Sequence, residues 1–275
     1  MEKRTREYSV LMSVYAKDNP VWLKVAIDSM MKQTMQPNQF VIVIDGPVEK
    51  TLNDILTDYE SADDRFLILR LSENQGLSHA LNLGLNYCLG TYIARMDADD
   101  YSVPQRCEVQ LDAIINEGLD FVGCNVDEFI DIPDNVVSRV ELPEFRSEMV
   151  AMAKRRCPVR HPALMLSKKA IHTIGGYDES LINGQDYDLV VRLLMRGFNC
   201  KNIQKPLVKM RVSPDFYKRR GGLAYYKKIK RVKSKLYRLG FYSKKDYVIG
   251  LVAHGISCVI PNCLREQLYK HVLRS

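Results

Sequence analysis

Three carboxylates, Asp97, Asp99 and Asp100, directly follow the apolar segment Tyr92–Met96. An apolar run that stops at paired acids places them at the carboxyl end of a buried strand, the edge at which open α/β sheets bind ligands. Carboxylates crowded there repel one another unless a cation neutralises them, and Mg²⁺ or Mn²⁺ prefers such oxygen ligands. The pattern predicts a divalent metal that holds a phosphorylated ligand, although these acids could instead cap a helix that begins near Pro104.

Three other segments carry groups with both a functional and a structural interpretation. Asp45 follows the apolar segment Phe40–Ile44 and could accept a hydrogen bond from a base such as uracil, or could simply form a turn. The segment Asn74–Ser78 opens a helix, where glycine lets the backbone approach a phosphate or merely forms a turn and cap. Asp186 begins another helix, and its carboxylate could face a cleft or cap that helix.

The elements that must position these groups alternate between strands and helices. We expect strands at residues 8–15, 40–44, 66–71 and 92–96, with helices at 20–31, 52–59, 77–89 and from 104. This alternation predicts a parallel sheet with right-handed crossovers, and the first ~115 residues look like a nucleotide-binding half of the Rossmann kind. Further along we expect strands at 119–129 and 163–167, helices at 144–156 and 186–196, and a loop or edge excursion at 133–143. Trp22 is expected in the core.

Six motifs in a fixed order point to one family. They are SVLMSVYAKDNPVWLKVAIDSMMKQT, VIVIDG, NQGLSHALNLGL, YIARMDADD, GGYDE and GQDYDLVVRLL. With them, residues 8–212 resemble the family 2 glycosyltransferases, whose GT-A fold is a Rossmann-like, mostly parallel sheet flanked by helices. Arg219-Arg220-Gly221-Gly222 and the basic C-terminal segment are similar to the subgroup that builds bacterial exopolysaccharide, capsule or O-antigen repeat units.

The resemblance implies a role for each chemical group. Asp45 would bind the base of a nucleotide sugar, Asp97 would lie near the ribose, and Asp99 would bind Mn²⁺ or Mg²⁺. Asp186 would be the catalytic base that takes a proton from the acceptor hydroxyl as it attacks the anomeric carbon, so that a single displacement inverts the anomeric configuration. The other nucleotide-sugar-binding residues would be Ser13, Val14, Tyr15, Asn74, Gly76 and Ala98.

Two departures from the family pattern affect the catalytic and metal sites. Gln185 precedes Asp186 where many members have glutamate, and this variant leaves the predicted base in place. Gln185 and His161 are expected near the acceptor, although His161 could equally be structural. Many members also have a metal-binding histidine after the last core strand, but residues 210–215 contain none. We therefore expect Asp99, diphosphate and water to hold the metal, with weak affinity when no nucleotide is bound.

The resemblance implies an inverting transferase that moves a hexose (glucose, galactose or an N-acetyl analogue) from a UDP-sugar to a glycan acceptor. The expected acceptor is a sugar linked to undecaprenyl diphosphate. Two alternatives stay open: a catalytically inactive sugar-binding or scaffold protein, and a nucleotidyltransferase on a similar fold. The second would need a glycine-rich phosphate loop with a basic residue near the N-terminus, which residues 13–19 do not provide.

Charge separates the chain into two parts. Residues 216–275 contain 15 lysines and arginines against two acids, a net charge of +13, which leaves −6 for residues 1–215. We expect a GT-A domain at 1–215, with a nucleotide-sugar half to about 115 and an acceptor half at 116–215, followed by a basic helical extension at 216–275. Residues 222–239 form an amphipathic pattern that favours an anionic membrane surface as partner over nucleic acid, although it could also be a solvated surface helix.

The remaining sequence features bear on location. No apolar run approaches the ~20 residues that span a bilayer, the N-terminus has no apolar signal segment, and the seven cysteines form no C-x-x-C pair. We expect a cytoplasmic protein, peripheral on the inner face of the cell membrane, and leave a homodimer open.

Overall fold

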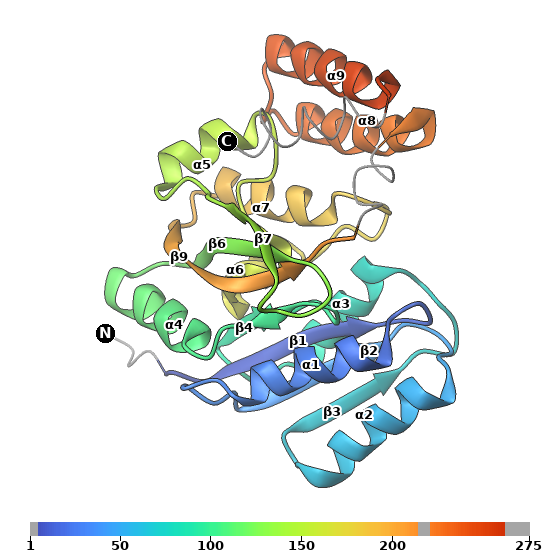
Figure 1. Cartoon of the computed structure of the whole chain (residues 1–275). Helices are drawn as coiled ribbons and strands as arrows, with labels where there is room; N and C mark the ends of the chain where they lie inside the picture. Colours follow the sequence, from blue (N-terminus) through green and yellow to red (C-terminus); the bar gives the residue numbers. More distant parts are fainter. Residues whose placement is uncertain (1–4, 214–220, 262–275) are drawn as a thin grey trace.

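The computed structural model describes residues 5–213 and 221–261, which fold around a nine-stranded sheet (Figure 1). Its strands are β1 (Tyr8–Val14), β2 (Gln39–Ile44), β3 (Phe66–Arg70), β4 (Tyr92–Arg95), β5 (Tyr101–Ser102), β6 (Phe121–Phe129), β7 (Val136–Val140), β8 (Met165–Ser167) and β9 (Cys200–Arg211). The helices are α1 (Pro20–Met31), α2 (Lys50–Ala62), α3 (Leu77–Tyr87), α4 (Arg106–Glu117), α5 (Arg146–Ala153), α6 (Lys168–Thr173), α7 (Gln185–Met195), α8 (Gly222–Arg238) and α9 (Lys244–Val259).

The first half of the chain forms the predicted parallel sheet. The strand order is β3-β2-β1-β4-β8-β6-β9-β5, and β1 pairs in parallel with both β2 and β4. The chain therefore moves outward from β1 to β3 and then returns to the other side of β1 for β4. The carboxyl ends of β1 and β4 meet at this reversal, the place where doubly wound sheets bind their ligands.

The second half of the sheet mixes both strand directions. β8 runs antiparallel between β4 and β6, whereas β6 pairs in parallel with β9. Residues 136–140, inside the predicted edge excursion, form β7 and pair antiparallel with β6. The expected strands did not include β9, because the polar pair Gln204-Lys205 and Pro206 interrupt the apolar pattern at its centre. Its pairing with β6 shows that tertiary contacts decide this strand.

Helices cover both faces of the sheet because side chains of a strand point alternately to opposite sides. Val10 and Met12 of β1 belong to one apolar cluster, which includes side chains of α1, α2 and α4. Leu11, between them, belongs to the other cluster, which includes side chains of α3, α5, α6 and α7. The result is the three-layer α/β architecture that the sequence predicts.

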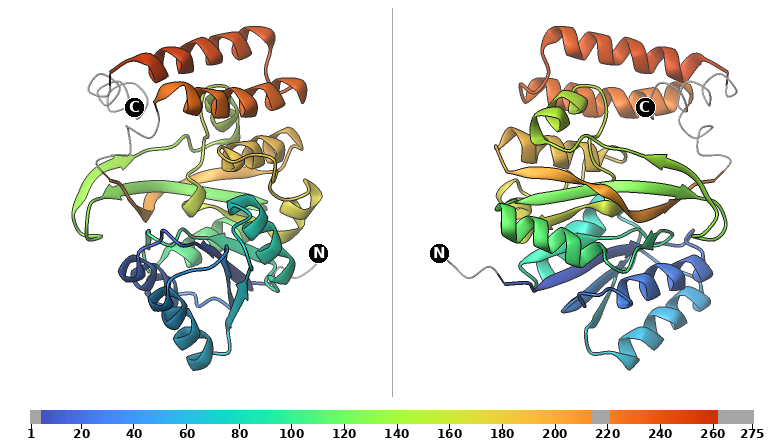
Figure 2. Two further views of the ribbon diagram at one scale, coloured as in Figure 1. Left: turned by 90° about the vertical axis from the view of Figure 1, so that its right-hand side faces the viewer. Right: turned by 60° about the vertical axis from the view of Figure 1, so that its left-hand side comes forward.

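The α8–α9 hairpin lies outside α7, at the end of the molecule opposite α2 and β3 (Figure 2). Val232 and Leu236 of α8 are buried in the same apolar cluster as the side chains of α7. Tyr237 of α8 stacks on Tyr247 of α9, with ring centroids 4.7 Å apart. Among the described residues, no helix has the length and apolarity needed to cross a bilayer.

The prediction that Trp22 lies in the core is wrong. Its side chain is 37% exposed, and the guanidinium group of Arg211 lies 4.2 Å from its ring centroid. The neighbouring residues Leu23 and Ile27 form the buried face of α1. Trp22 therefore points towards the end of β9, where its ring stacks with a cation.

Candidate active site

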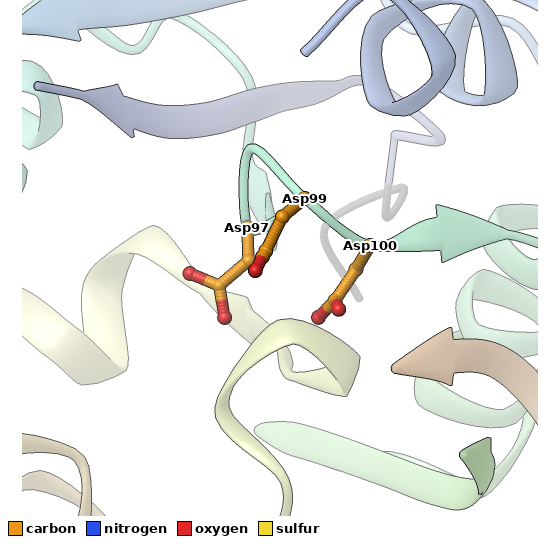
Figure 3. A group of neighbouring side chains, drawn as sticks. All are labelled: Asp97, Asp99 and Asp100. Atoms are coloured by element: carbon orange, nitrogen blue, oxygen red, sulfur yellow. The ribbon is translucent and has the colours of Figure 1, made fainter. Parts of the chain in front are cut away.

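The three carboxylates of the loop after β4 gather at one point. Figure 3 shows Asp97, Asp99 and Asp100 extending from the same side of the loop between β4 and β5. Their ligand oxygens all lie within 4.8 Å of one another. Because β4 pairs with β1, this loop lies at the reversal of the strand order. The three acids therefore lie together at the edge of the sheet where the strand order reverses.

Asp100 is buried and does not cap a helix. Its Oδ1 accepts a hydrogen bond of 2.7 Å from the backbone N–H of Arg211, and Nε of Arg211 donates to the carbonyl of Asp99 at 3.0 Å. The N-cap residue of α4 is Gln105, which makes no side-chain cap. The helix-capping interpretation of the acid cluster is therefore wrong, since Asp100 instead ties the loop to β9.

The electrostatics of this cluster fit a divalent cation. Burial and the charge of Asp97 raise the pKa of Asp99 to about 6, and burial with both neighbours raises that of Asp100 well above its usual range. Burial, with the charges of Asp99 and Asp97, also raises the pKa of Asp18 to about 7. A hard cation bound by these oxygens would remove the repulsion, so the donor set suits Mg²⁺ or Mn²⁺.

Arg95 lies buried at the centre of the site. Its Nη2 forms an ion pair with Asp97, while Nε and Nη1 have no hydrogen-bond partner among the described residues. Burial raises the pKa of Asp99, Asp100, Asp186 and Tyr177, and the charge of Arg95 opposes this rise. Burial lowers the pKa of His161, and the same charge adds to that effect. A buried guanidinium group with two unused donors is costly, which is typical of a group that awaits a ligand.

Asp45 connects the end of β2 to the loop before α3. Its two carboxylate oxygens accept the backbone N–H groups of Gln75 (2.7 Å) and Gly76 (3.0 Å), and its carbonyl accepts from the Asn74 side chain at 3.0 Å. Gly46 permits this approach, because a Cβ there would lie 2.5 Å from the backbone nitrogen of Asn74. The carboxylate therefore orders the loop that opens α3, and its remaining lone pairs can still accept a base N–H.

Asp186 is the second residue of α7, behind the N-cap Gly184, so it does not cap the helix. Burial raises its pKa, and the backbone N–H of Tyr187 and the charge of Arg95 oppose this. His161, in a short turn before β8, is 2.8 Å from the Tyr177 hydroxyl, and burial, then Arg95, lowers its pKa well below the usual range. Asp186 and His161 are linked through Tyr177, because burial and the charge of Asp186 raise the pKa of the hydroxyl group that contacts His161.

The structure places the other predicted residues as follows. Ser13 and Val14 end β1 and Tyr15 follows them, so these three residues border the acidic loop. Ala98 is buried inside that loop, between Asp97 and Asp99. Gln185, the first residue of α7, is adjacent to the predicted base, and its side-chain oxygen is buried without a partner among the described residues.

Three residues of the site had no role in our sequence interpretation: Asp18, Arg95 and Arg211. Asp18 lies between β1 and α1, directly before the N-cap Asn19. The sequence does contain a signal for Arg95, because this residue lies inside an apolar strand two residues before Asp97. A buried charge needs a partner, so the position indicates an ion pair with a nearby acid. No local pattern places Arg211 beside the acidic loop, because this contact depends on the pairing of β9 with β5 and β6.

A Rossmann-like sheet with acids at its reversal and a further carboxylate on a neighbouring helix is typical of the GT-A class of sugar-transferring folds. The family model described as Glycosyl transferase family 2 matches residues 9–175. The chain belongs to this family and is a glycosyltransferase. The match ends before Asp186, so the base candidate lies outside it.

Relatives and solved structures agree with this assignment. An Escherichia coli protein named UDP-Gal:alpha-D-GlcNAc-diphosphoundecaprenol beta-1,3-galactosyltransferase is 33% identical over 278 positions, which cover 100% of this chain and 99% of the relative. The amylovoran biosynthesis glycosyltransferase AmsE of Erwinia amylovora is 31% identical over 85% of this chain and 88% of its own length.

The structural similarity extends over nearly the whole chain. S. aureus TarS 1–349 in complex with UDP-GlcNAc superposes with a TM-score of 0.64 at 13% identity, covering 97% of this chain and 71% of TarS 1–349. The mannosyltransferase PcManGT from Pyrobaculum calidifontis, in complex with GDP-Man and Mn²⁺, superposes with a TM-score of 0.63 at 16% identity. The superposition covers 96% of this chain and 72% of PcManGT. At these identities the comparison establishes the GT-A fold.

Proposed function

We propose that this glycosyltransferase is metal-dependent and inverting, and that it moves a hexose from a UDP-sugar to a sugar carried on undecaprenyl diphosphate. The observation that carries this proposal is the convergence of acids with different tasks around Arg95. Asp97 pairs with this guanidinium group, and the same charge acts on Asp99 and on Asp186. A site that holds a diphosphate and also deprotonates a hydroxyl needs both kinds of carboxylate within one pocket.

The roles follow from the positions of the groups. Asp99, with Asp97 beside it, would hold Mn²⁺ or Mg²⁺, which supplies charge stabilisation to the departing diphosphate when bound. Asp45 and the backbone that it orders would receive the uracil end of the donor. The unused Nε and Nη1 donors of Arg95 would bind hydroxyl or phosphate oxygens of the donor.

Asp186 would act as the general base. Its carboxylate accepts the proton of the acceptor hydroxyl while the oxygen forms a bond to the anomeric carbon and the bond to the UDP oxygen breaks. The neutral state of His161 leaves it able to orient an acceptor hydroxyl group, and its bond to Tyr177 fixes its ring. One displacement inverts the anomeric configuration, so no covalent enzyme intermediate is required.

The substrates are supported by the relatives. The Escherichia coli relative, named for UDP-galactose and GlcNAc-diphosphoundecaprenol, aligns with this chain from end to end. We therefore place galactose first among the donor sugars and lipid-diphosphate GlcNAc first among the acceptors. The amylovoran relative supports a role in bacterial polysaccharide synthesis.

A substrate screen tests the proposal. Wild-type protein is incubated with UDP-galactose, UDP-glucose or their N-acetyl analogues, with Mn²⁺ or Mg²⁺, and with synthetic lipid-diphosphate GlcNAc or GalNAc. We expect one product whose new linkage, determined by NMR, has the opposite anomeric configuration to the donor. A retained configuration would exclude the single displacement, and no transfer or donor hydrolysis with any pair would favour an inactive sugar-binding protein.

We also propose that the α8–α9 hairpin binds an anionic membrane surface, which would bring the enzyme to its lipid-linked acceptor. α9 presents an exposed apolar stripe, whose members are between 48% and 85% exposed: Val248, Ile249, Val252, Ile256 and Val259. Exposed lysines flank it at the start of α9 and on α8, at positions 244, 245, 227 and 228. Apolar insertion next to basic side chains is the pattern of interfacial helices, and it favours anionic lipid over a protein partner.

A variant with Ile249→Glu and Ile256→Glu is expected to bind phosphatidylglycerol vesicles roughly tenfold or more weakly than the wild type, because two apolar anchors are lost. Vesicle sedimentation measures this, with Leu89→Glu, at an exposed apolar residue outside the hairpin, as the matched control. Wild-type binding should weaken at high salt and on neutral phosphatidylcholine vesicles. Equal binding by the variant and the wild type would show that this face does not contact lipid.

A further inference from the structure

The N-terminus of α7, which carries Asp186, lacks a side-chain cap. Gly184 occupies the N-cap position with a φ of +74°, and no side chain accepts a hydrogen bond there. The preceding loop contains two more glycines with positive φ, at positions 175 and 176. The local sequence therefore restrains the first turn of α7 only weakly, and tertiary contacts must provide the rest.

The α8–α9 hairpin provides contacts on both sides of Asp186. Val232 of α8 packs against Gly184, since a Cβ atom at this glycine would lie 3.0 Å from Cγ2 of Val232. Tyr242, in the loop between α8 and α9, shares a hydrogen bond with the hydroxyl group of Tyr187, the residue that follows Asp186. Asp186 therefore lies between two residues, Gly184 and Tyr187, that the C-terminal hairpin contacts.

Lys235 of α8 makes the polar part of the same interface. Its Nζ lies 2.5 Å from Oδ1 of Asp188 in α7 and 2.7 Å from Oδ2 of Asp178 in the preceding loop. Asp188 is completely buried, and its other oxygen is 2.7 Å from Nε of Arg192. Arg192 in turn donates two hydrogen bonds of 2.7 Å to carbonyl groups of the glycine loop. One ammonium group thus joins the hairpin, α7 and the loop.

Burial makes this network sensitive to the loss of Lys235. Only 21% of the Lys235 side chain and 24% of that of Asp178 are exposed. Although burial opposes it, hydrogen bonds from Lys235 and Ser180 lower the pKa of Asp178 to about 2, so this carboxylate stays charged near neutral pH. Removing one partner of a buried ion pair leaves an uncompensated charge, which destabilises the arrangement that holds it.

We propose that Lys235 is a positioning residue for sugar transfer: through Asp188 and Asp178 it holds the first turns of α7 so that Asp186 faces the acceptor. The inference rests on the role of Asp186 in the proposed function. It assigns the α8–α9 hairpin to the catalytic fold, because the hairpin supports the base directly and not only by attachment to a membrane.

The test compares Lys235→Met, which keeps the aliphatic stem and removes the charge, with Lys230→Met at an exposed position of the same helix. We expect kcat to fall about 10- to 100-fold in Lys235→Met, because a misplacement of about 1 Å can cost 10²-fold in rate. The KM for the donor and the affinity for UDP with Mn²⁺ should change little. Lys235→Arg should restore part of kcat, and Lys230→Met should match the wild type. Assays in detergent with a short-chain diphosphate acceptor exclude an effect of membrane binding.

Hydrogen exchange provides a readout that does not need activity. Amides of residues 184–190 should exchange faster in Lys235→Met than in Lys230→Met. If the wild type transfers no sugar, the proposed function fails, while the exchange rates still decide whether Lys235 orders α7. Unchanged kcat or unchanged exchange in folded Lys235→Met protein overturns the inference.

A second comparison applies if Lys235→Met does not fold. In Lys235→Met the carboxylate of Asp178 loses its partner, and Asp178→Asn removes that carboxylate. The double variant is therefore measured against Asp178→Asn alone. A lower kcat in the double variant supports the positioning role through Asp188. Equal kcat values in the two proteins overturn it.

Discussion

Replacing Asp186 by asparagine is expected to lower kcat about 10²- to 10⁴-fold, the typical contribution of a general base. Asparagine keeps the shape of the side chain but cannot accept the proton of the acceptor hydroxyl. Binding of UDP with Mn²⁺, measured by calorimetry, should change little, because the base does not hold the donor. Asp64→Asn, at an exposed acid far from the acidic loop in the sequence, is the matched control and should keep the wild-type kcat.

The pH dependence of the wild type should report the same group. Burial raises the pKa of Asp186, against hydrogen bonding to the backbone of Tyr187 and the charge of Arg95. A base acts only when deprotonated, so kcat/KM should rise with pH through this raised pKa, above the ~3.9 of an ordinary aspartate. The acid limb should disappear in Asp186→Asn. A variant that retains both rate and acid limb would show that another group is the base.

The raised pKa also predicts that Asp186→Asn stabilises the fold at neutral pH. Between the unfolded and folded pKa values the folded protein binds more protons than the unfolded chain, so the free energy of unfolding falls as pH rises. Above both values the full penalty of the buried carboxylate is present, and asparagine does not have it. Denaturant unfolding should therefore show a gain in stability that is larger at pH 7.5 than at pH 5.

The second large effect is expected for Asp99→Asn, which should lose metal-stimulated transfer by about 10²-fold or more, since a bound metal supplies several kcal/mol of charge stabilisation. Mn²⁺ binding, followed by electron paramagnetic resonance with and without UDP, tests the ligand role apart from catalysis. The variant should lose the part of Mn²⁺ binding that depends on UDP. Asp64→Asn again serves as the control.

The wild type should bind Mn²⁺ weakly until UDP is added. Arg95 pairs with Asp97, and Nε of Arg211 donates to the carbonyl of Asp99 while its backbone N–H donates to the Asp100 carboxylate. These groups of the protein already offset part of the negative charge. A nucleotide diphosphate adds the oxygens that complete the metal site. Tight Mn²⁺ binding without UDP would contradict this, and full metal-stimulated activity in Asp99→Asn would show that Asp99 is not the ligand.

Much of the fold and part of the site could be predicted because they depend on local patterns. The acids Asp45 and Asp97 each follow an apolar strand, and parallel strands bring their carboxyl ends to one edge. The strand at residues 200–211, the exposure of Trp22 and the partner of Asp100 could not be predicted, because each depends on how β9 pairs with distant strands.

By itself, the sequence determined the family, the order of the strands and helices in the first half, and the acids that carry the proposed chemistry. Apolar periodicity and residue type encode these features within a few neighbouring positions. Only the tertiary structure decided which charges surround those acids. Arg211 reaches the acidic loop from the end of β9, and Lys235 reaches the helix of Asp186 from 49 positions further along the chain. Such contacts arise from packing between segments far apart in sequence, so no local pattern can specify them.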